Sequence, residues 1–264
     1  MTRLLQITDC HVVALTKLVS GRLNTSQLLS AAIDRIQDDL LKIGPLDGIV
    51  VTGDVSDDGS AESYEIFSEL IGSLKVPLFV IPGNHDCRET MRGHFFGTSH
   101  AFDGQRLNWV HQFEDLLLIG LDTIVPRSGG GVVDDETLEF LMDALSSTDL
   151  PAIVAMHHPP FQSGVHFMDA ISLSGGEKLE KVLDGASKEV RLICGHLHTL
   201  SIGALGRHVA ITSPATCSSF EVDFRREAPV GFTTKPGGYM IHDYSNGFRS
   251  TLVPFTQGSG PHPF

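Results

Sequence analysis

The feature of this sequence that most constrains its fold is a series of short polar clusters, each placed directly after an apolar run. The clusters are Asp9-Cys10-His11, Gly53-Asp54, Gly83-Asn84-His85-Asp86, His157-His158-Pro159-Pro160 and Gly195-His196-Leu197-His198. Short apolar runs that end in such clusters are typical of buried strands. We therefore expect strands at Leu4–Ile7, Gly48–Val51, Pro77–Ile81, Ala152–Met156 and Val190–Cys194.

Helical patterns lie between the expected strands. Capping residues and apolar spacing predict helices from a cap at Thr25 to about Ile43, from Ser60 to Leu74, and from Asp134 or Asp135 to Ser147. The alternation of strands and helices predicts a layered α/β fold. Ligands in such folds bind beyond the carboxyl ends of the strands, so we expect the polar clusters to converge at one edge.

The last third of the chain, from about Leu200, is rich in β-prone residues, with runs at His208–Thr212, Gly238–His242 and Arg249–Val253. We expect a single domain over residues 1–264, in which residues 200–264 complete a second sheet. The predicted fold is a four-layer α/β/β/α sandwich of two mixed β-sheets flanked by helices. The run from Phe220 to Pro236 has no periodicity and predicts a long excursion, which either shapes substrate access or an oligomer contact, or is a solvated loop.

The polar clusters contain residue types that bind transition metals. Carboxylate and amide oxygens combined with neutral imidazoles suit Mn, Fe, Zn or Co better than Ca or Mg. Each cluster alone is weak, because a single His beside an apolar run is more simply a hydrogen-bonded, partly buried imidazole. The ordered set at strand ends favours a two-metal phosphoesterase site.

On these clusters, which span Asp9 to His198, the chain resembles the calcineurin-like metallophosphoesterases. Within that family it is similar to the class III cyclic nucleotide phosphodiesterases and the bacterial glycerophosphodiesterases. The stretch Gly53–Gly59, followed by Tyr64, resembles the second motif of this subgroup and lacks the Arg of the Ser/Thr protein phosphatases. Some members of the wider family are scaffolds without activity, but the intact ligand positions here favour an enzyme.

The resemblance implies two metal ions, divalent or of mixed valence. One ion is expected at Asp9, His11 and His198, the other at Asn84, His157 and His196, with Asp54 bridging them. A hydroxide held between two such ions would attack the phosphorus of a small phosphodiester. The expected catalytic residues are Asp54, Asn84 and His85, and His85 would donate a hydrogen bond to the phosphate or protonate the leaving group.

Several neighbouring residues have more than one interpretation at this stage. His158 either supports the site or is structural, Asp86 either orients His85 or a loop or is a surface carboxylate, and Asp122 either supports the site or caps a loop. Glycerophosphodiesterase relatives carry a His near the position of Ser218. Its absence slightly favours cyclic nucleotides, with glycerophosphodiesters and other diesters or phosphonate esters as alternatives.

Two loops are candidates for the substrate pocket. The loop after the fourth cluster could line a leaving-group pocket through Phe161, His166, Phe167 and Met168, although such side chains are at least as often ordinary packing. The loop after the first cluster could reach substrate through Lys17, Arg22 and Asn24. Asn24 fits equally well as a helix start.

Composition limits the partners and the compartment. A net charge of −13 argues against stable nucleic-acid binding, which needs a basic face, but bound cations would still attract a single anionic diester. The four cysteines form no C-x-x-C pair and indicate a reducing compartment. Without a signal-peptide pattern or an apolar run of membrane-spanning length, we expect a cytoplasmic protein that does not bind membranes. The family resemblance suggests a homo-oligomer, a dimer or larger.

Overall fold

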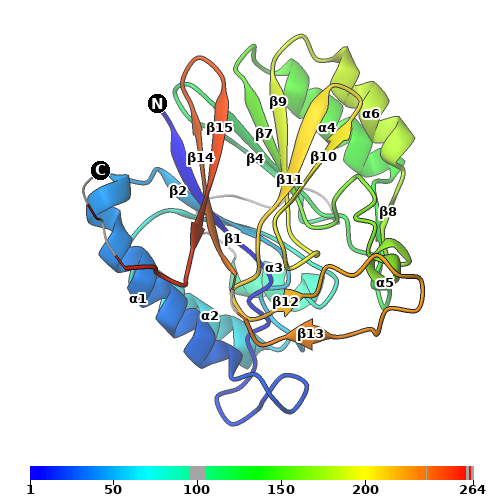
Figure 1. Ribbon diagram of the computed structural model, residues 1–264. Coiled ribbons are helices and arrows are strands. Elements are labelled where there is room, and N and C mark those ends of the chain that lie inside the picture. The colour runs from blue at the N-terminus through cyan, green and yellow to red at the C-terminus, as the bar shows by residue number, and fades with distance from the viewer. Residues whose placement is uncertain (96–104, 236, 260–261, 263–264) are drawn as a thin grey trace.

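Two mixed β-sheets form the centre of the computed structural model, which describes residues 1–95, 105–235, 237–259 and 262 (Figure 1). The first sheet has the order β15-β14-β1-β2-β3. These strands are Phe248–Pro254, Gly238–Tyr244, Arg3–Ile7, Gly48–Thr52 and Leu78–Ile81, in that order. β1, β2 and β3 run parallel, whereas β14 is antiparallel to β1 and β15 is antiparallel to β14.

The second sheet has the order β10-β11-β9-β7-β5-β4. These strands are Ser201–Leu205, His208–Thr212, Val190–Cys194, Ala152–Met156, Leu117–Leu121 and Trp109–Gln112. The four inner strands are parallel, and β10 and β4 close the edges as antiparallel strands. Two short ladders lie outside the sheets and pair β6 (Gly131–Val132) with β8 (Leu173–Ser174) and β12 (Ser219–Phe220) with β13 (Phe232–Thr233).

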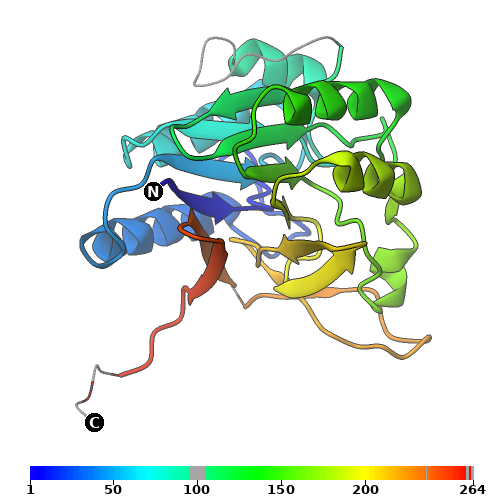
Figure 2. The ribbon, with the colours of Figure 1, turned by 90° about the horizontal axis from the view of Figure 1, so that it is seen from above.

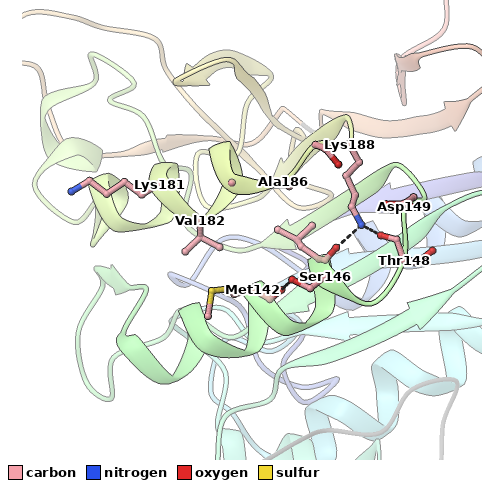
Figure 3. Close-up of a pocket in the computed structure, with 11 residues that line it drawn as sticks. Met142, Ser146, Thr148, Asp149, Lys181, Val182, Ala186 and Lys188 are labelled. Carbon is pink, nitrogen blue, oxygen red and sulfur yellow. Dashed lines mark hydrogen bonds between the residues drawn. The ribbon is translucent and has the colours of Figure 1, made fainter.

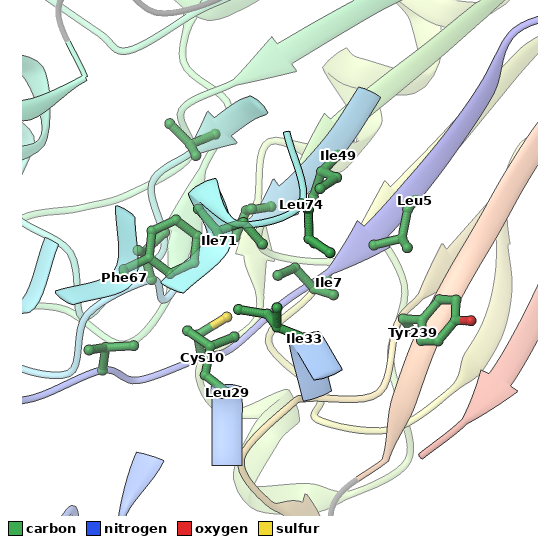
Figure 4. Close-up of a cluster of buried hydrophobic side chains, with 14 of the residues drawn as sticks. Leu5, Ile7, Cys10, Leu29, Ile33, Ile49, Phe67, Ile71, Leu74 and Tyr239 are labelled. Atoms are coloured by element: carbon green, nitrogen blue, oxygen red, sulfur yellow. The ribbon is translucent and has the colours of Figure 1, made fainter. Parts of the chain in front are cut away.

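Helices cover the outer face of each sheet. α1 (Thr25–Ile43) and α2 (Ala61–Gly72) pack on the first sheet, where Leu29, Ile33 and Phe67 contact a cluster that includes Leu5 and Ile7 (Figure 4). α4 (Asp135–Ser146) and α6 (Gly176–Gly185) cover the second sheet in the same way. The shorter α3 (Arg88–His94) and α5 (His166–Asp169) lie near the carboxyl ends of the parallel strands (Figure 1).

The inner faces of the two sheets form a third apolar layer. Leu4 and Val50 of the first sheet share this cluster with Leu118, Ile153 and Ile193 of the second. Leu4 and its neighbour Leu5 belong to different clusters because successive side chains of a strand point to opposite faces. Both sheets are thus buried on two sides, and the predicted α/β/β/α sandwich is confirmed.

Most predicted element boundaries are close to those of the structure, with one wrong helix cap. α1 is capped by Asn24, whose side-chain oxygen accepts a hydrogen bond from the backbone N–H of Gln27 at 3.1 Å. Thr25 was expected to be the cap but lies in the first turn of the helix. Ser60 and Asp134 cap α2 and α4, as expected, and α2 ends at Gly72 rather than Leu74.

The C-terminal third differs from the prediction that residues 200–264 complete the second sheet. β10 and β11 do extend that sheet, but β14 and β15 belong to the first, because β14 occupies the side of β1 that β2 leaves open. Phe255, directly after β15, still packs against the core of the first sheet, and residues 256–259 lead away from both sheets (Figure 2). The excursion from residue 220 to 236 lies between β11 and β14; its last residue, Pro236, is outside the described residues.

Candidate metal centre

The polar clusters converge where the parallel strands of both sheets end. β1 leads to Asp9 and His11, β2 to Asp54 and β3 to Asn84, all from the first sheet. β7 leads to His157 and β9 to His196 and His198, from the second sheet. A direct bond joins the two sets, since the backbone N–H of His196 donates to Asp9 Oδ2 at 3.1 Å. The candidate site therefore lies at the seam between the sheets.

One group of ligand atoms gathers around Asp9. His198 Nε2 lies 3.3 Å from Asp9 Oδ1 and 3.2 Å from His11 Nε2, and His11 Nε2 lies 3.5 Å from Asp54 Oδ2. All four side chains are buried. Two imidazole nitrogens and two carboxylates that face one another in this way match the donor set of a transition-metal ion.

A second group gathers around His157. Its Nε2 lies 3.1 Å from Asn84 Oδ1 and 3.5 Å from Asp54 Oδ2, and its ring centre lies 5.1 Å from that of His196. Asp54 Oδ2 is therefore equally distant from His11 Nε2 and His157 Nε2, one in each group. A carboxylate in this position can contribute to two cation sites at once.

Each of the four histidines also has a partner for its second ring nitrogen. The Nδ1 atoms of His11, His157 and His198 lie 2.9 Å from Asp57 Oδ1, 2.8 Å from the Thr52 carbonyl oxygen and 3.2 Å from Ser218 Oγ, respectively. Their Nε2 atoms are thereby directed into the site. His196 has the opposite arrangement, because its Nε2 lies 3.2 Å from the Ile171 carbonyl oxygen and leaves Nδ1 available. Such partners fix the ring orientation of metal-binding histidines.

The ring of His158 lies close to those of His157 and His196, and both of its nitrogens have partners in the protein. Its Nδ1 lies 2.8 Å from Thr123 Oγ1 and its Nε2 lies 3.1 Å from the Gly129 carbonyl oxygen, so both ring nitrogens are occupied. Burial, reinforced by the neighbouring imidazoles of His157 and His196, holds the pKa of His158 well below its usual value. The side chain is a neutral part of the wall behind the ligands.

The backbone of the site is strained at the expected ligands. Nine non-glycine residues of the described chain have a positive φ, and five of them are Asp9 (51°), His11 (47°), Asp54 (49°), His196 (70°) and His198 (53°). Left-handed backbone costs on the order of 1 kcal/mol or more for such residues. That these positions are not glycine indicates that their side chains are needed where this backbone places them.

Glycines in the same clusters provide the space for this packing. A Cβ on Gly83 would lie 2.2 Å from Asp54 Oδ1, and one on Gly53 would lie 2.4 Å from His157 Nδ1. A Cβ on Gly195 would lie 2.8 Å from Asp9 Oδ2. The glycines that directly precede Asp54, Asn84 and His196 are therefore required by the close approach of neighbouring site residues.

The electrostatics of the site favour cations. Burial lowers the pKa of His11, but the hydrogen bond to Asp57 and the charges of Asp54 and Asp9 outweigh it and raise the pKa to about 9. In the same way the charge of Asp54 overcomes burial and raises the pKa of His157 to about 9. Buried carboxylates thus draw positive charge into both groups, and the residues fit two divalent cations.

His85 stands apart from the ligand groups. Its side chain is 42% exposed, and its backbone N–H donates to Asp54 Oδ1 at 2.9 Å. Its Nδ1 lies 3.2 Å from the carbonyl oxygen of Asp57 and 3.4 Å from Asp57 Oδ1. The ring is packed edge-on against His11, with 4.7 Å between ring centres, so it borders the site from the solvent side.

Asp86 and Asp122 hold the loops around the site. Asp86 is buried and accepts hydrogen bonds from the backbone N–H groups of Gly83 and Ser56, at 2.8 and 3.0 Å, and from the Tyr64 hydroxyl at 3.0 Å. It therefore orients loops and is not a surface carboxylate. Asp122, also buried, accepts two hydrogen bonds from the Arg88 guanidinium and one from the N–H of Ile124, so it both caps its loop and anchors the start of α3.

A cavity of about 310 Å³ lies over the ligands. Besides the site residues it is lined by Val19, Ser20, Leu23, Phe167, Met168, Ile171, Cys217, Ser218, Phe220, Val230 and Phe232. Phe167 and Met168 line it as expected, whereas Phe161 and His166 do not. The first loop contributes Val19, Ser20 and Leu23 in place of the expected Lys17, Arg22 and Asn24. The excursion from residue 220 to 236 borders the cavity through Phe220, Val230 and Phe232, which agrees with its interpretation as a segment that shapes substrate access.

A larger cavity, of about 460 Å³, is unrelated to this chemistry. It lies between α4 and α6, and its lining residues include none of the predicted site residues (Figure 3). The ammonium group of Lys188 donates to the carbonyl oxygens of Leu145 and Thr148 at one end of it (Figure 3). These bonds satisfy carbonyl groups near the end of α4. Lys188 therefore stabilises a helix terminus and does not mark a substrate site.

Sequence reasoning missed some residues that shape the site. Asp57, which contacts both His11 and His85, lies in the second motif, and its position there was the available signal. The carbonyl groups of Thr52 and Ile171 have no sequence signal, because any residue can supply them. Phe220 was part of the predicted excursion but was not singled out.

Comparisons with known proteins agree with this geometry. The sequence profile of a family described as calcineurin-like phosphoesterase matches residues 2–200. A probable glycerophosphodiester phosphodiesterase of Arcobacter nitrofigilis is 28% identical over 98% of this chain and 95% of its own length. The 3′,5′-cyclic adenosine monophosphate phosphodiesterase of Escherichia coli is 31% identical over 83% of this chain and 78% of its own. A purple acid phosphatase from yellow lupin shares the fold, with a TM-score of 0.69, 13% identity, and coverage of 98% of this chain and 52% of its own.

Proposed function

This chain belongs to the calcineurin-like phosphoesterase family, a family of metal-dependent hydrolases, and we propose that it hydrolyses small phosphodiesters, cyclic nucleotides first among them. The observation that carries the proposal is the position of Asp54. Its Oδ2 lies 3.5 Å from a ring nitrogen of each ligand group, which suits a shared ligand of two cations. Two-metal sites of this kind serve displacement at phosphorus.

We assign Asp9, His11 and His198 to one cation, Asn84, His157 and His196 to the other, and Asp54 to both. Mn, Fe, Zn and Co all suit this mixture of imidazole, carboxylate and amide donors. When bound, the cations supply Lewis acidity toward the phosphate and allow water to ionise at neutral pH. The chain itself fixes the ligand rings through their second nitrogens and keeps the carboxylates buried.

We assign His85 to the phosphate. Its Nδ1 is within hydrogen-bond distance of the Asp57 carbonyl oxygen, which leaves Nε2 as the ring nitrogen available to a substrate in the cavity that His85 lines. A proton at Nε2 can be donated to a phosphate oxygen or to the departing alkoxide. The carboxylate of Asp57, with Oδ1 3.4 Å from Nδ1, helps to hold the ring in this orientation.

Glycerophosphodiesters are the second candidate substrate class, because similar proteins carry that name. Ser218 stands where a His is expected in glycerophosphodiesterases, and its hydroxyl contacts His198 rather than extending the donor set toward a polar leaving group. The apolar lining of the cavity also suits a nucleoside better than glycerol. Cyclic nucleotides therefore come first, ahead of glycerophosphodiesters and broader diester or phosphonate-ester hydrolysis.

The test is turnover by the Mn-reconstituted protein on a panel of 3′,5′-cyclic nucleotides, glycerophosphodiesters and bis(p-nitrophenyl) phosphate. Asp54→Ala is the control on each substrate, and metal content is measured in parallel. We expect metal-dependent hydrolysis with the highest kcat/KM for a cyclic nucleotide. Absence of turnover on every diester with two metals bound would contradict the proposal and favour a scaffold.

We also propose a cytoplasmic homo-oligomer, a dimer or larger, without stable nucleic-acid binding. All four cysteines are free thiols, as a reducing compartment requires, and the net charge of −13 disfavours polyanions. Within the described part of the chain, no helix has both the length and the apolar character needed to cross a bilayer. Light scattering of the purified protein tests the oligomeric state.

A further inference from the structure

Two phenylalanines form an aromatic wall directly beside the metal centre. Phe220, from β12, is stacked on the ring of His198, with 4.4 Å between ring centres and 28° between planes. Phe167, from α5, meets Phe220 at 88° with 5.3 Å between centres. Both are partly exposed and both line the cavity over the ligands. Phe220 thus contacts His198, a residue that we assign to a cation, and Phe167 contacts Phe220.

The rest of the cavity beyond the metal centre is mostly apolar. Apart from Ser20, Cys217 and Ser218, the residues that line it outside the metal centre are aliphatic, aromatic or Met. None of the described lining residues is Lys or Arg, so a second phosphate would have no cationic side chain there. Neither Trp nor Tyr, which would strengthen the binding of a quaternary ammonium group, is in the lining either. The lining suits an uncharged, flat group.

The size of the cavity agrees with a group of this kind. About 310 Å³ is at the small end of the range for ligand pockets, which is sufficient for a mononucleotide but not for a polymer. Flat bases stack well on aromatic side chains because every base has a π-face.

The two segments that carry Phe167 and Phe220 contact the metal centre and each other. Ile171, which follows α5, lies with its carbonyl oxygen 3.2 Å from His196 Nε2. Phe224 of the excursion packs against Gly164, where a Cβ would lie 3.0 Å from its ring. The positions of Phe167 and Phe220 are therefore set by the same framework that places the ligands.

We propose that Phe167 and Phe220 form a subsite for a flat aromatic ring carried by the diester, and that this subsite determines substrate preference. The inference rests on the proposed function and deepens it, because it names the residues that select ring-bearing diesters over aliphatic ones. Ring stacking of this kind stabilises the bound substrate and the transition state alike. Its loss should raise KM and leave kcat nearly unchanged.

The experiment compares two substrates with the same scissile bond in the metal-loaded enzyme. They are 3′,5′-cyclic AMP and the 3′,5′-cyclic phosphate of methyl riboside, in which a methoxy group replaces the base. We expect kcat/KM to be at least about tenfold higher for cyclic AMP, an effect of the size measured for one base on an aromatic side chain. Phe167→Leu should reduce this ratio several-fold through KM.

Two further variants provide controls. Phe140→Leu changes the same residue type on α4, partly buried and outside the cavity lining, and should leave the ratio unchanged. Phe220→Leu should lower the ratio like Phe167→Leu, and its metal content must be measured because Phe220 contacts His198. Equal kcat/KM values for the two substrates in the wild-type enzyme would overturn the subsite while leaving the phosphodiesterase proposal intact.

A binding measurement separates the two proposals. Calorimetry on the metal-loaded protein compares AMP with ribose 5-phosphate, independently of turnover. Tighter binding of AMP that is lost in Phe167→Leu supports the subsite even if no diester is hydrolysed, which would contradict only the proposed function. Equal affinities overturn the subsite. A Phe167-dependent preference for glycerophosphocholine over cyclic AMP would also overturn it, in favour of a cation-binding pocket.

Discussion

Asn84 and His85 are adjacent in sequence but contact different groups, so alanine substitutions at the two positions can be compared directly. The amide oxygen of Asn84 lies 3.1 Å from His157 Nε2 within the ligand group, whereas His85 borders the cavity. Asn84→Ala should therefore lower both metal content and turnover. His85→Ala should keep both metals and lower kcat by about 10²- to 10⁴-fold, the usual contribution of an acid catalyst. Metal analysis with steady-state kinetics checks both, and metal loss in His85→Ala would contradict its assignment.

Gly83 tests how tightly the ligands are packed. A Cβ at this position would lie 2.2 Å from Asp54 Oδ1 and 2.3 Å from the backbone nitrogen of Asp54. Gly83→Ala should displace Asp54 and abolish metal-dependent turnover. The control is Gly93→Ala, in α3, where no atom of the described residues lies within 4 Å of the added Cβ and alanine is the better helix former. Normal activity and metal content in Gly83→Ala would show that the loop can move.

The proposed ligand residues could be picked out from the sequence because each lies within four residues of the end of a strand, and a strand end fixes where the residues just after it lie. His11 and His198 meet at 3.2 Å although they are far apart in the chain. The choice of ring nitrogen could not be predicted. For His196 it depends on the carbonyl oxygen of Ile171, a backbone contact between segments that share no sequence pattern.

At the scale of elements, Asp39 joins α1 to β14. It accepts hydrogen bonds from Arg35, Lys42 and the Tyr239 hydroxyl. Burial raises the pKa of Asp39, but these bonds outweigh it and hold the pKa below its usual value. Because an unfolded Asp has a pKa of about 3.9, the bonds stabilise the fold above about pH 4, and this stabilisation is lost as the pH falls toward the folded pKa.

Asp39→Asn should therefore lower the free energy of unfolding by about 1–3 kcal/mol at pH 7, and the deficit should shrink below pH 4. Urea unfolding of both proteins between pH 3 and 7 measures it. A matched control is Asp38→Asn, on the same helix. A deficit that is the same at pH 3 and pH 7 would show that Asp39 acts through packing and not through its charge.

Most strands and helices could be predicted from the sequence, but the strand that each strand pairs with could not. Apolar runs predicted β11, β14 and β15 within one or two residues, but a run of this kind indicates a strand without indicating its neighbour. The side of β1 taken by β14 is settled only when the whole first sheet is assembled. Likewise, Asn24 and Thr25 are both good capping residues, and only the packing of Thr25 in the first turn distinguishes them.

At the scale of the molecule, the proposed metal ligands come from both sheets. Asp9, His11, Asp54 and Asn84 follow strands of the first sheet, and His157, His196 and His198 follow strands of the second. Cations bound there should stabilise the folded state, because the unfolded chain has no such site. At a free metal concentration about 100 times Kd the gain is about 2.7 kcal/mol, or roughly 5–10 °C in Tm. Calorimetry with and without a chelator checks this, and Asp54→Ala should show a smaller shift. An unchanged Tm in the wild-type protein would contradict metal binding by the folded state.

The pairing of β1 with β14 has a consequence for synthesis. β1 is translated before β2, which pairs with one of its sides, but β14 is translated only after every proposed ligand of the metal centre. Until then the nascent chain carries an apolar strand with an unpaired hydrogen-bonding edge, a template for association with other chains. β14 therefore acts late in biogenesis, as the strand that closes this edge.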